Sequence, residues 1–546
     1  MSDSSPKRAR LVRIAALVAV GVGASGCAAS GDGGAGSERL SYLEAQAWIT
    51  LYPPDGGFYP NGAVLNQIAD RLLYQNTETL ELEPWIAEEL PEVNEDATEY
   101  TFTLREGVTY SDGTPLDAEN VAKNIDLYGT GDADRALGPS ETIHAYEGSE
   151  VVDERTVTFR FSEPAPGFAQ AVSTINSGLL SDDTLDQSRD EFGPGGATEI
   201  VGSGPFVIVD EQIDTALTLD AREDYDWAPA SREHQGAPQI AGIDLTVVEE
   251  ASVRVGTAAT GQADVARQIP PADEERFDAP GLHLFVGPTS GVANSLSLRF
   301  AHPLLEDIRV RQAIIAGIDR EQIVETLFTD SYPLATGILT TTALGYVDTS
   351  DSWVHDPAEA ERLLDEAGWD PGSDGIREKD GERLVIAFNE ALPLQRSREV
   401  VTLIQEQLAE IGVGVELLSG DQATQNDAQQ DIERVQVYHQ LVGRGDYEVL
   451  KSQYFGANRN ALLNADPETG AVRDEELENL LADIASEPTP EGRQAASEAA
   501  QRHLIEQAYV LPLFEEPLVY GLSDEVRGFG TESVGRPSFY DVSIER

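Results

Sequence analysis

Strand-like and helix-like patterns alternate along nearly the whole of this chain, and this alternation limits the folds that it can adopt. Residues 100–104 and 156–161 alternate polar and apolar side chains, as half-buried strands do. Residues 310–318 and 398–411 instead carry apolar residues at spacings of three and four, which is typical of helices, and a strand-like segment at 384–388 separates them. The alternation predicts mixed α/β domains. Because a single core stops growing at about 250–300 residues, we expect a chain of 546 residues to form two or three globular units.

The N-terminus has the order of a secretory signal. Four basic residues among the first 13 precede the apolar residues 14–22, and small residues at 23–26 lead to Cys27. The apolar segment is too short to cross about 30 Å of hydrocarbon as a helix. Transport out of the cytoplasm is therefore expected.

Cys27 is the only cysteine in the chain, so no intrachain disulfide can form. Residues 24–27, Ala-Ser-Gly-Cys, resemble a bacterial lipobox, in which cleavage leaves a lipidated cysteine at the new N-terminus. A plain signal peptide with an incidental cysteine is the alternative. We expect residues 1–27 to be a lipoprotein signal peptide ending at the lipidated Cys27, and residues 28–37, rich in Gly, Ser and Ala, to be a flexible tether.

The charge of the chain limits its partners. Asp and Glu number 97 against 37 Lys and Arg, which gives a formal net charge of -60. Such a surface repels nucleic acid and anionic lipid headgroups, so no nucleic-acid partner is expected. Net charge describes the surface rather than a binding site, and solubility explains it as well as a cationic ligand does.

The chain shows no pattern typical of catalysis. Its seven histidines are scattered, with no H-E-x-x-H motif or close pair, and no G-x-S-x-G motif is complete. We therefore expect no enzymatic activity, no cofactor and no metal bound by a dedicated set of side chains.

Several separated segments carry a resemblance to a known family. Residues 100–116 read YTFTLREGVTYSDGTPL, 202–206 read GSGPF, 307–314 read DIRVRQAI, 317–320 read GIDR and 511–514 read LPLF. In this order they resemble the family 5 solute-binding proteins, the extracytoplasmic receptors of peptide, nickel and related ABC importers. The same segments also suit turns and strand starts, so we do not expect them to contact a ligand.

The resemblance implies a two-lobed, periplasmic-binding-protein-like α/β fold of the class II type, with a ligand buried between the lobes. It divides the chain into a first lobe at 38–68, 195–290 and 511–546, an inserted subdomain of that lobe at 69–194, and a second lobe at 291–510. It also implies a monomer that delivers a small molecule to ABC permease subunits in the membrane. A surface sensor or a chaperone-like protein that has kept the fold is a further alternative.

Expected ligand contacts come from segments that should line the cleft between the lobes. Aromatic residues gather around the Pro-Pro-Asp-Gly-Gly turn at 53–57, where their rings can stack on a ligand, although simple core packing explains each of them too. The expected ligand-binding residues are Trp48, Tyr52, Phe58, Tyr59, Asn61, Asn294, Tyr454, Asn458 and Arg459.

The second lobe departs from the pattern of peptide receptors in the family. These receptors commonly hold the ligand's ammonium group with an acidic residue in a region that corresponds to 445–462. Where many of them carry an aromatic residue and Asp-Pro, this chain has Asn458, Arg459 and Asn460, and we expect Asp446 to begin a core strand. The departure favours a small organic solute as the ligand, with an oligopeptide, a dipeptide or a nickel chelate as alternatives.

Overall fold

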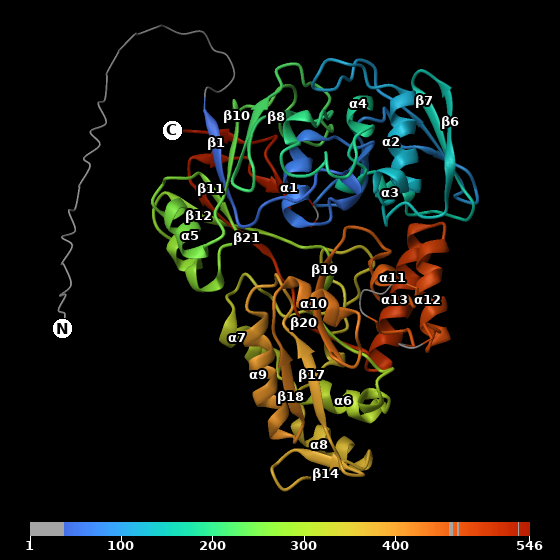
Figure 1. Ribbon diagram of the computed structural model, residues 1–546, viewed down its shortest axis with the longest axis vertical. Coiled ribbons are helices and arrows are strands. Elements are labelled where there is room, and N and C mark those ends of the chain that lie inside the picture. The colour runs from blue at the N-terminus through green and yellow to red at the C-terminus, as the bar shows by residue number, and fades with distance from the viewer. Residues whose placement is uncertain (1–37, 458–461, 467–468, 533) are drawn as a thin grey trace, which may run out of the picture. The chain divides into compact units, whose positions relative to one another are not determined.

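The computed structural model describes residues 38–457, 462–466, 469–532 and 534–546 (Figure 1). The expected signal peptide with Cys27, the expected tether, and the expected contacts Asn458 and Arg459 lie outside the described residues. Within the described residues, no helix is long and apolar enough to cross a membrane.

A seven-stranded mixed sheet contains strands from both ends of the described chain. Strand β1 runs parallel to both of its neighbours, and the other pairs in the sheet are antiparallel. Alternate side chains of β1, such as Leu40 and Tyr42, are fully buried. In sheet order the strands are β12 (Leu282–Gly287), β21 (Leu518–Ser523), β11 (Val265–Arg267), β1 (Arg39–Glu44), β10 (Gly242–Val247), β9 (Ala216–Ala221) and β8 (Phe206–Gln212).

A five-stranded mixed sheet is built from the later part of the chain. Its strand β13 is buried along its whole length between β19 and β20. In sheet order the strands are β18 (Gly414–Leu418), β17 (Val385–Asn389), β19 (Val437–Gly443), β13 (Gly291–Leu298) and β20 (Val510–Phe514). The main helices around it are α6 (Ile308–Ala316), α7 (Arg320–Leu327), α8 (Pro357–Glu366), α9 (Ser397–Glu410), α12 (Glu475–Ser486) and α13 (Pro490–Glu506) (Figure 1).

The chain passes between the two sheets at two short connections. The first, 288–290, joins β12 to β13, and the second, 515–517, joins β20 to β21. The sequence placed residues from 511 onward in the first lobe. Strand β20 pairs with β13, so residues 511–514 belong to the five-stranded sheet. An apolar LPLF segment fits either sheet, so its pattern could not place the boundary.

Residues between α1 (Tyr59–Ile68) and β8 form a smaller sheet with its own helix. Its strands are β4 (Glu92–Val93), β5 (Glu99–Thr103), β7 (Thr156–Phe161) and β6 (Tyr146–Asp153), and α2 (Ala118–Thr130) packs against β6 and β7. The predicted strands at 100–104 and 156–161 are thus confirmed within one residue at each end. Helix α2 starts at Asp117, whose carboxylate accepts a hydrogen bond from the backbone N–H of Asn120.

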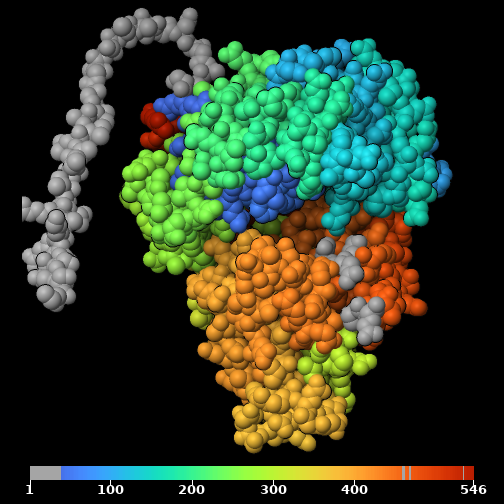
Figure 2. Space-filling view, viewed as in Figure 1, coloured from blue at the N-terminus to red at the C-terminus, as the bar shows by residue number. Residues whose placement is uncertain are grey.

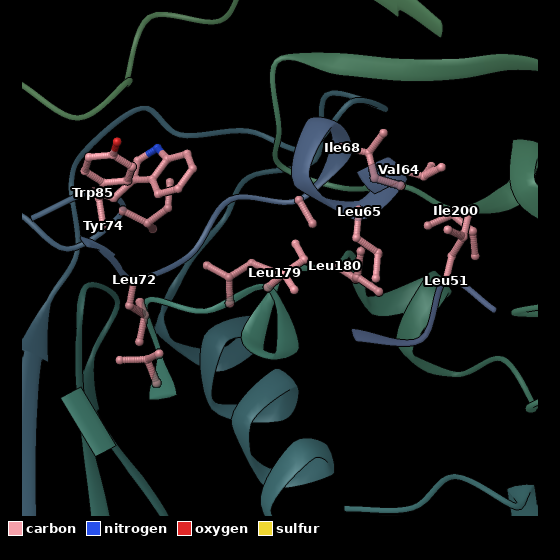
Figure 3. Close-up of a cluster of buried hydrophobic side chains, with 14 of the residues drawn as sticks. Leu51, Val64, Leu65, Ile68, Leu72, Tyr74, Trp85, Leu179, Leu180 and Ile200 are labelled. Carbon is pink, nitrogen blue, oxygen red and sulfur yellow. The ribbon is translucent and has the colours of Figure 1, made fainter. Parts of the chain in front are cut away.

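A continuous core joins this smaller sheet to the seven-stranded one. Figure 3 shows Val64, Leu65 and Ile68 of α1 close to Leu180 and Ile200, which come from much later in the chain. All five side chains are at most 3% exposed. Helix α1 therefore has a fixed position, and the turn that precedes it is held in place.

The remaining elements are short. They are α3 (Phe168–Ala171), α4 (Asp182–Leu185), α5 (Ala251–Ala259), α10 (Gln422–Gln429), α11 (Val449–Tyr454), and the strand pairs or triplets β2 (Leu73–Gln75) with β3 (Leu82–Pro84), β14 (Asp370–Pro371) with β15 (Arg377–Lys379) and β16 (Glu382–Arg383), β22 (Val526–Arg527) with β25 (Ser543–Ile544), and β23 (Gly530–Thr531) with β24 (Pro537–Ser538).

Candidate ligand-binding cleft

A polar cavity of about 470 Å³ is walled by segments that are distant in the sequence. One wall comes from the turn before α1, including Asp55 and Phe58, and from Asn176. Another part of the wall comes from β19, including Gln440, and from Arg444. A volume of this size holds a small organic molecule.

A second cavity of about 270 Å³ continues the first towards the connections between the sheets. Both cavities share wall residues, among them Phe58, Leu441 and Arg536. The second cavity adds Gln395 of the later chain and Glu516 of the second connection. We call the two cavities together the cleft.

Polar contacts cross from the early chain to the later chain beside the cleft. Gln75 donates from Nε2 to the carbonyl oxygen of Gly445 over 3.1 Å, and Ser452 donates a hydrogen bond to Glu141. Nη1 of Arg444 lies 3.4 Å from Oε1 of Glu141. Figure 2 shows the orange atoms of the later chain meeting the blue and cyan atoms of the early chain along one seam. The two sides of the cleft are therefore in direct contact.

His144 adds a contact to the same seam. Its Nδ1 atom lies 3.6 Å from Oε2 of Glu448, yet burial lowers the pKa of the imidazole and outweighs the attraction of the carboxylate. His144 is therefore neutral near pH 7, and the contact is a polar one rather than a full ion pair.

Five carboxylates line the cleft, and four of them are paired with arginine. The paired carboxylates, each with its arginine and the N···O distance, are Asp55 (Arg189, 2.8 Å), Glu141 (Arg444, 3.4 Å), Asp446 (Arg444, 2.5 Å) and Glu532 (Arg536, 3.0 Å). Arg267, a further wall residue, is paired with the buried Glu44 at 2.5 Å. Across the described part of the chain, Glu516 makes no ion pair with a basic side chain. Arg444 is shared by Glu141 and Asp446, whereas Glu516 is the wall carboxylate that has no basic partner of its own among the described residues.

Glu516 is held in place by hydrogen bonds to its carboxylate. Oε2 accepts from Nδ2 of Asn294 over 2.8 Å, and Oε1 accepts from the backbone N–H of Gln395 over 3.4 Å. Burial raises the pKa of Glu516 to about 7, although the two hydrogen bonds favour the ionised form. The side chain is only part-buried, and it faces the cleft.

Asn294 links Glu516 to a buried polar network. Because its amide nitrogen donates to Glu516, its Oδ1 atom accepts from Nε2 of His439, over 2.7 Å. Nδ1 of His439 then accepts from the hydroxyl of Ser397 over 2.9 Å. Burial lowers the pKa of His439 to about 4, so the imidazole is neutral. Asn294 itself is fully buried and does not line the cleft. Its link to the cleft is its hydrogen bond to Glu516.

Two of the expected ligand contacts, Phe58 and Tyr59, line the cleft, and a third, Asn61, does not. Phe58 lines both cavities and is 37% exposed. Tyr59 lines the second cavity, with the guanidinium of Arg267 4.8 Å from its ring centre. Asn61 is fully buried and accepts from the backbone N–H of Ile49 over 2.8 Å, so it shapes the turn and does not line the cleft.

Three more of the expected ligand contacts, Trp48, Tyr52 and Tyr454, are packed inside the protein. Tyr52 is fully buried, donates to the carbonyl oxygen of Gly138 over 2.9 Å, and packs against the rings of Tyr128 and Phe192. Trp48 and Tyr454 are 5% and 1% exposed. None of these three lines the cleft, so the cavity walls give no support to them as ligand contacts.

Sequence reasoning missed the later half of the wall. Gln440, Arg444, Glu516 and Arg536 line the cleft and were not among the expected contacts. One feature of the sequence points to Glu516: two glutamates and a proline directly follow the apolar segment 510–514. An acidic pair at the end of a buried strand indicates a site at that strand end. The other three residues carry no such signal.

The described residues contain no group of three or more His, Cys, Asp or Glu side chains arranged to hold a metal ion.

The protein has two mixed sheets that are joined by two short connections, and a cleft between them is lined from both sides. This arrangement is typical of solute-binding proteins. The model of the bacterial extracellular solute-binding proteins, family 5, matches residues 81–455. The chain belongs to this family, which confirms the predicted class: a solute-binding protein of ABC importers.

Individual relatives agree with this class. The chain is 30% identical to Protein XP55 of Streptomyces lividans over 381 residues, which are 68% of this chain and 65% of that protein. It is 23% identical to the glutathione-binding protein GsiB of Escherichia coli O1:K1 / APEC, over 98% of this chain and all of GsiB. The crystal structure of NikA from Brucella suis in complex with Fe(III)-EDTA superposes with a TM-score of 0.76 at 23% identity, over 93% of this chain and 100% of NikA. This likeness confirms the predicted α/β periplasmic-binding-protein-like fold.

Proposed function

We propose that this protein captures a small organic solute in the cleft and presents it to ABC permease subunits outside the cytoplasmic membrane. One observation carries the proposal: a cavity of about 470 Å³ is walled by both the early and the later chain. A ligand in such a place can hold the two sides together, and a membrane partner can detect the closed form.

The proposed lobes follow the two sheets. The first lobe comprises 38–287 and 518–546, with 69–194 as its inserted subdomain, and the second comprises 291–514. The connections 288–290 and 515–517 act as the hinge between them. The contacts of Glu141 with Arg444 and Ser452 are then latches that form when the lobes close.

The anchor and the absence of catalysis belong to the same proposal. Cys27 carries the lipid that holds the protein at the membrane, and the receptor is a monomer without hydrolytic activity. The names of the relatives support binding rather than catalysis, because GsiB is named for glutathione binding and NikA was crystallised with a metal chelate.

Native mass spectrometry of protein purified without denaturation tests this function. We expect a peak heavier than the mature chain by the mass of one small molecule, which disappears after denaturation and refolding. A protein that carries no solute, and that binds none from a library of peptides, amines and chelates, would contradict the proposal. A recovered peptide or nickel chelate would select one of the alternative ligands.

A further inference from the structure

Among the described residues, one carboxylate of the cleft wall, that of Glu516, has no basic partner. Asp55, Glu141, Asp446 and Glu532 each lie beside an arginine, with Arg444 shared by Glu141 and Asp446, whereas Glu516 is held only by uncharged donors. Burying a carboxylate without a cationic partner is costly. A part-buried glutamate that lines a cavity is therefore a place where a ligand can supply the missing charge.

We propose that Glu516 binds a protonated amino group of the solute, so that the transported molecule is an amine with an apolar body. This inference rests on the proposed function and names the chemical class of its ligand. A carboxylate offers about four acceptor positions, and Asn294 and Gln395 occupy two of them. The remaining positions can accept N–H groups from an ammonium ion in the cleft.

The surroundings of Glu516 suit the rest of such a molecule. The second cavity has apolar walls from Pro393, Leu394, Leu441 and Leu518, and the ring of Phe58 lines both cavities. These surfaces can cover an aliphatic or aromatic body while the ammonium group meets Glu516.

Two arginines line the same cavity and could be expected to repel a cation. Arg267 is paired with Glu44 at 2.5 Å, and Arg536 is paired with Glu532 at 3.0 Å and donates to the carbonyl oxygen of Gly57. Their charges are compensated within the protein, so Glu516 sets the sign of the free charge at this end of the cleft.

Asp446 is the competing acidic residue, because it lies in the region where peptide receptors of the family hold an ammonium group. Its carboxylate is 2.5 Å from Nε of Arg444 and accepts from the backbone N–H of Glu448 over 2.7 Å. A carboxylate engaged in this way has little attraction left for a ligand cation. The geometry therefore favours Glu516 over Asp446.

Calorimetric titration with phenethylamine and with its uncharged counterpart, 2-phenylethanol, tests the inference. At pH about 8 the amine is protonated, and Glu516, with its pKa of about 7, is mostly ionised. We expect the amine to bind about tenfold or more tightly than the alcohol. We expect Glu516→Gln to weaken amine binding by about the same factor while leaving the alcohol unchanged.

One matched variant serves as a control. Glu515, the neighbouring residue, bonds to Thr341 and does not line the cleft, so Glu515→Gln should keep the affinity for the amine. Asp446→Asn tests the competing acidic residue, which itself lines the first cavity. Melting temperatures of all variants in the absence of probe show whether a loss of binding reflects unfolding.

The outcomes separate this inference from the proposed function. Equal affinity of the amine for the wild type and for Glu516→Gln would overturn the inference. If Phe58→Ala then abolished binding of the same amine, the cleft would be supported as the binding site. Only the proposed role of Glu516 would be wrong. Loss of amine binding in Asp446→Asn but not in Glu516→Gln would move the cation site to the other acidic residue.

Discussion

Nδ2 of Asn294 donates a 2.8 Å hydrogen bond to Oε2 of Glu516, and this bond joins the middle of β13 to the second connection between the sheets. Asn294 also accepts from His439, so the cleft wall, the connection 515–517 and a buried histidine share one hydrogen-bonded network. Changes of charge at either end of this network should therefore alter stability as well as binding.

Glu516→Gln should change the pH dependence of stability. Folding raises the pKa of Glu516 from its ordinary value of 4.5 to about 7, so the stability linked to its proton is present below pH 4.5 and is lost as the pH rises through 7. The variant cannot lose that proton, and at pH about 8 it should gain on the order of 2–3 kcal/mol relative to the wild type. Urea unfolding at pH values from about 4 to 8 measures the difference. A difference that does not vary with pH would mean that Glu516 titrates normally.

His439 should contribute to acid sensitivity in the opposite direction. Folding lowers its pKa from 6.5 to about 4, so its contribution to stability is complete above pH 6.5 and is lost as the pH falls through 4. The loss amounts to about 3 kcal/mol. His439→Gln should be less stable than the wild type at pH about 7, because it loses the bond from Ser397, but this gap should narrow in acid. A gap that stays constant down to pH about 4 would argue against a neutral buried histidine.

Phe58 and Tyr52 should respond differently to truncation although both were expected to contact the ligand. Tyr52→Ala removes a fully buried ring and should cost about 3–5 kcal/mol of unfolding free energy. Phe58 is 37% exposed at the cleft, so Phe58→Ala should change stability by less than about 1 kcal/mol. Phenethylamine binding should be weakened in the Phe58 variant. Similar destabilisation by both substitutions would show that Phe58 is a core residue.

Cys27→Ser should release the protein from the membrane. The signal order of the first 27 residues and the absence of any other cysteine lead to this expectation. Ser25→Ala is the matched control, since it changes the same segment without removing the thiol. Fractionation of cells that express each variant measures the effect. A Cys27→Ser protein that sediments with the membranes as completely as the parent would rule out the anchor.

The sequence carried enough information for the fold but for only part of the site. Polar and apolar alternation located β5 and β7, because each of these strands has one face towards a core and one towards solvent. The same pattern could not show that Tyr52 packs against Tyr128 and Phe192, since those rings come from segments more than 70 residues away. Glu516 and Arg444 stayed hidden for the same reason: a cleft wall is assembled from distant segments, and its members share no local pattern.

The position of Glu516 has a consequence for the order of events in capture. It lies in one of the two three-residue connections, and in the proposed closing motion these connections form the axis about which the lobes rotate. Points on an axis move least, whereas Gln440 and Asn176 on the outer walls travel towards each other. An amine could therefore reach Glu516 while the lobes are still apart and remain there as they close. Recognition of charge would then precede enclosure, so the first selection among solutes would occur in the open receptor.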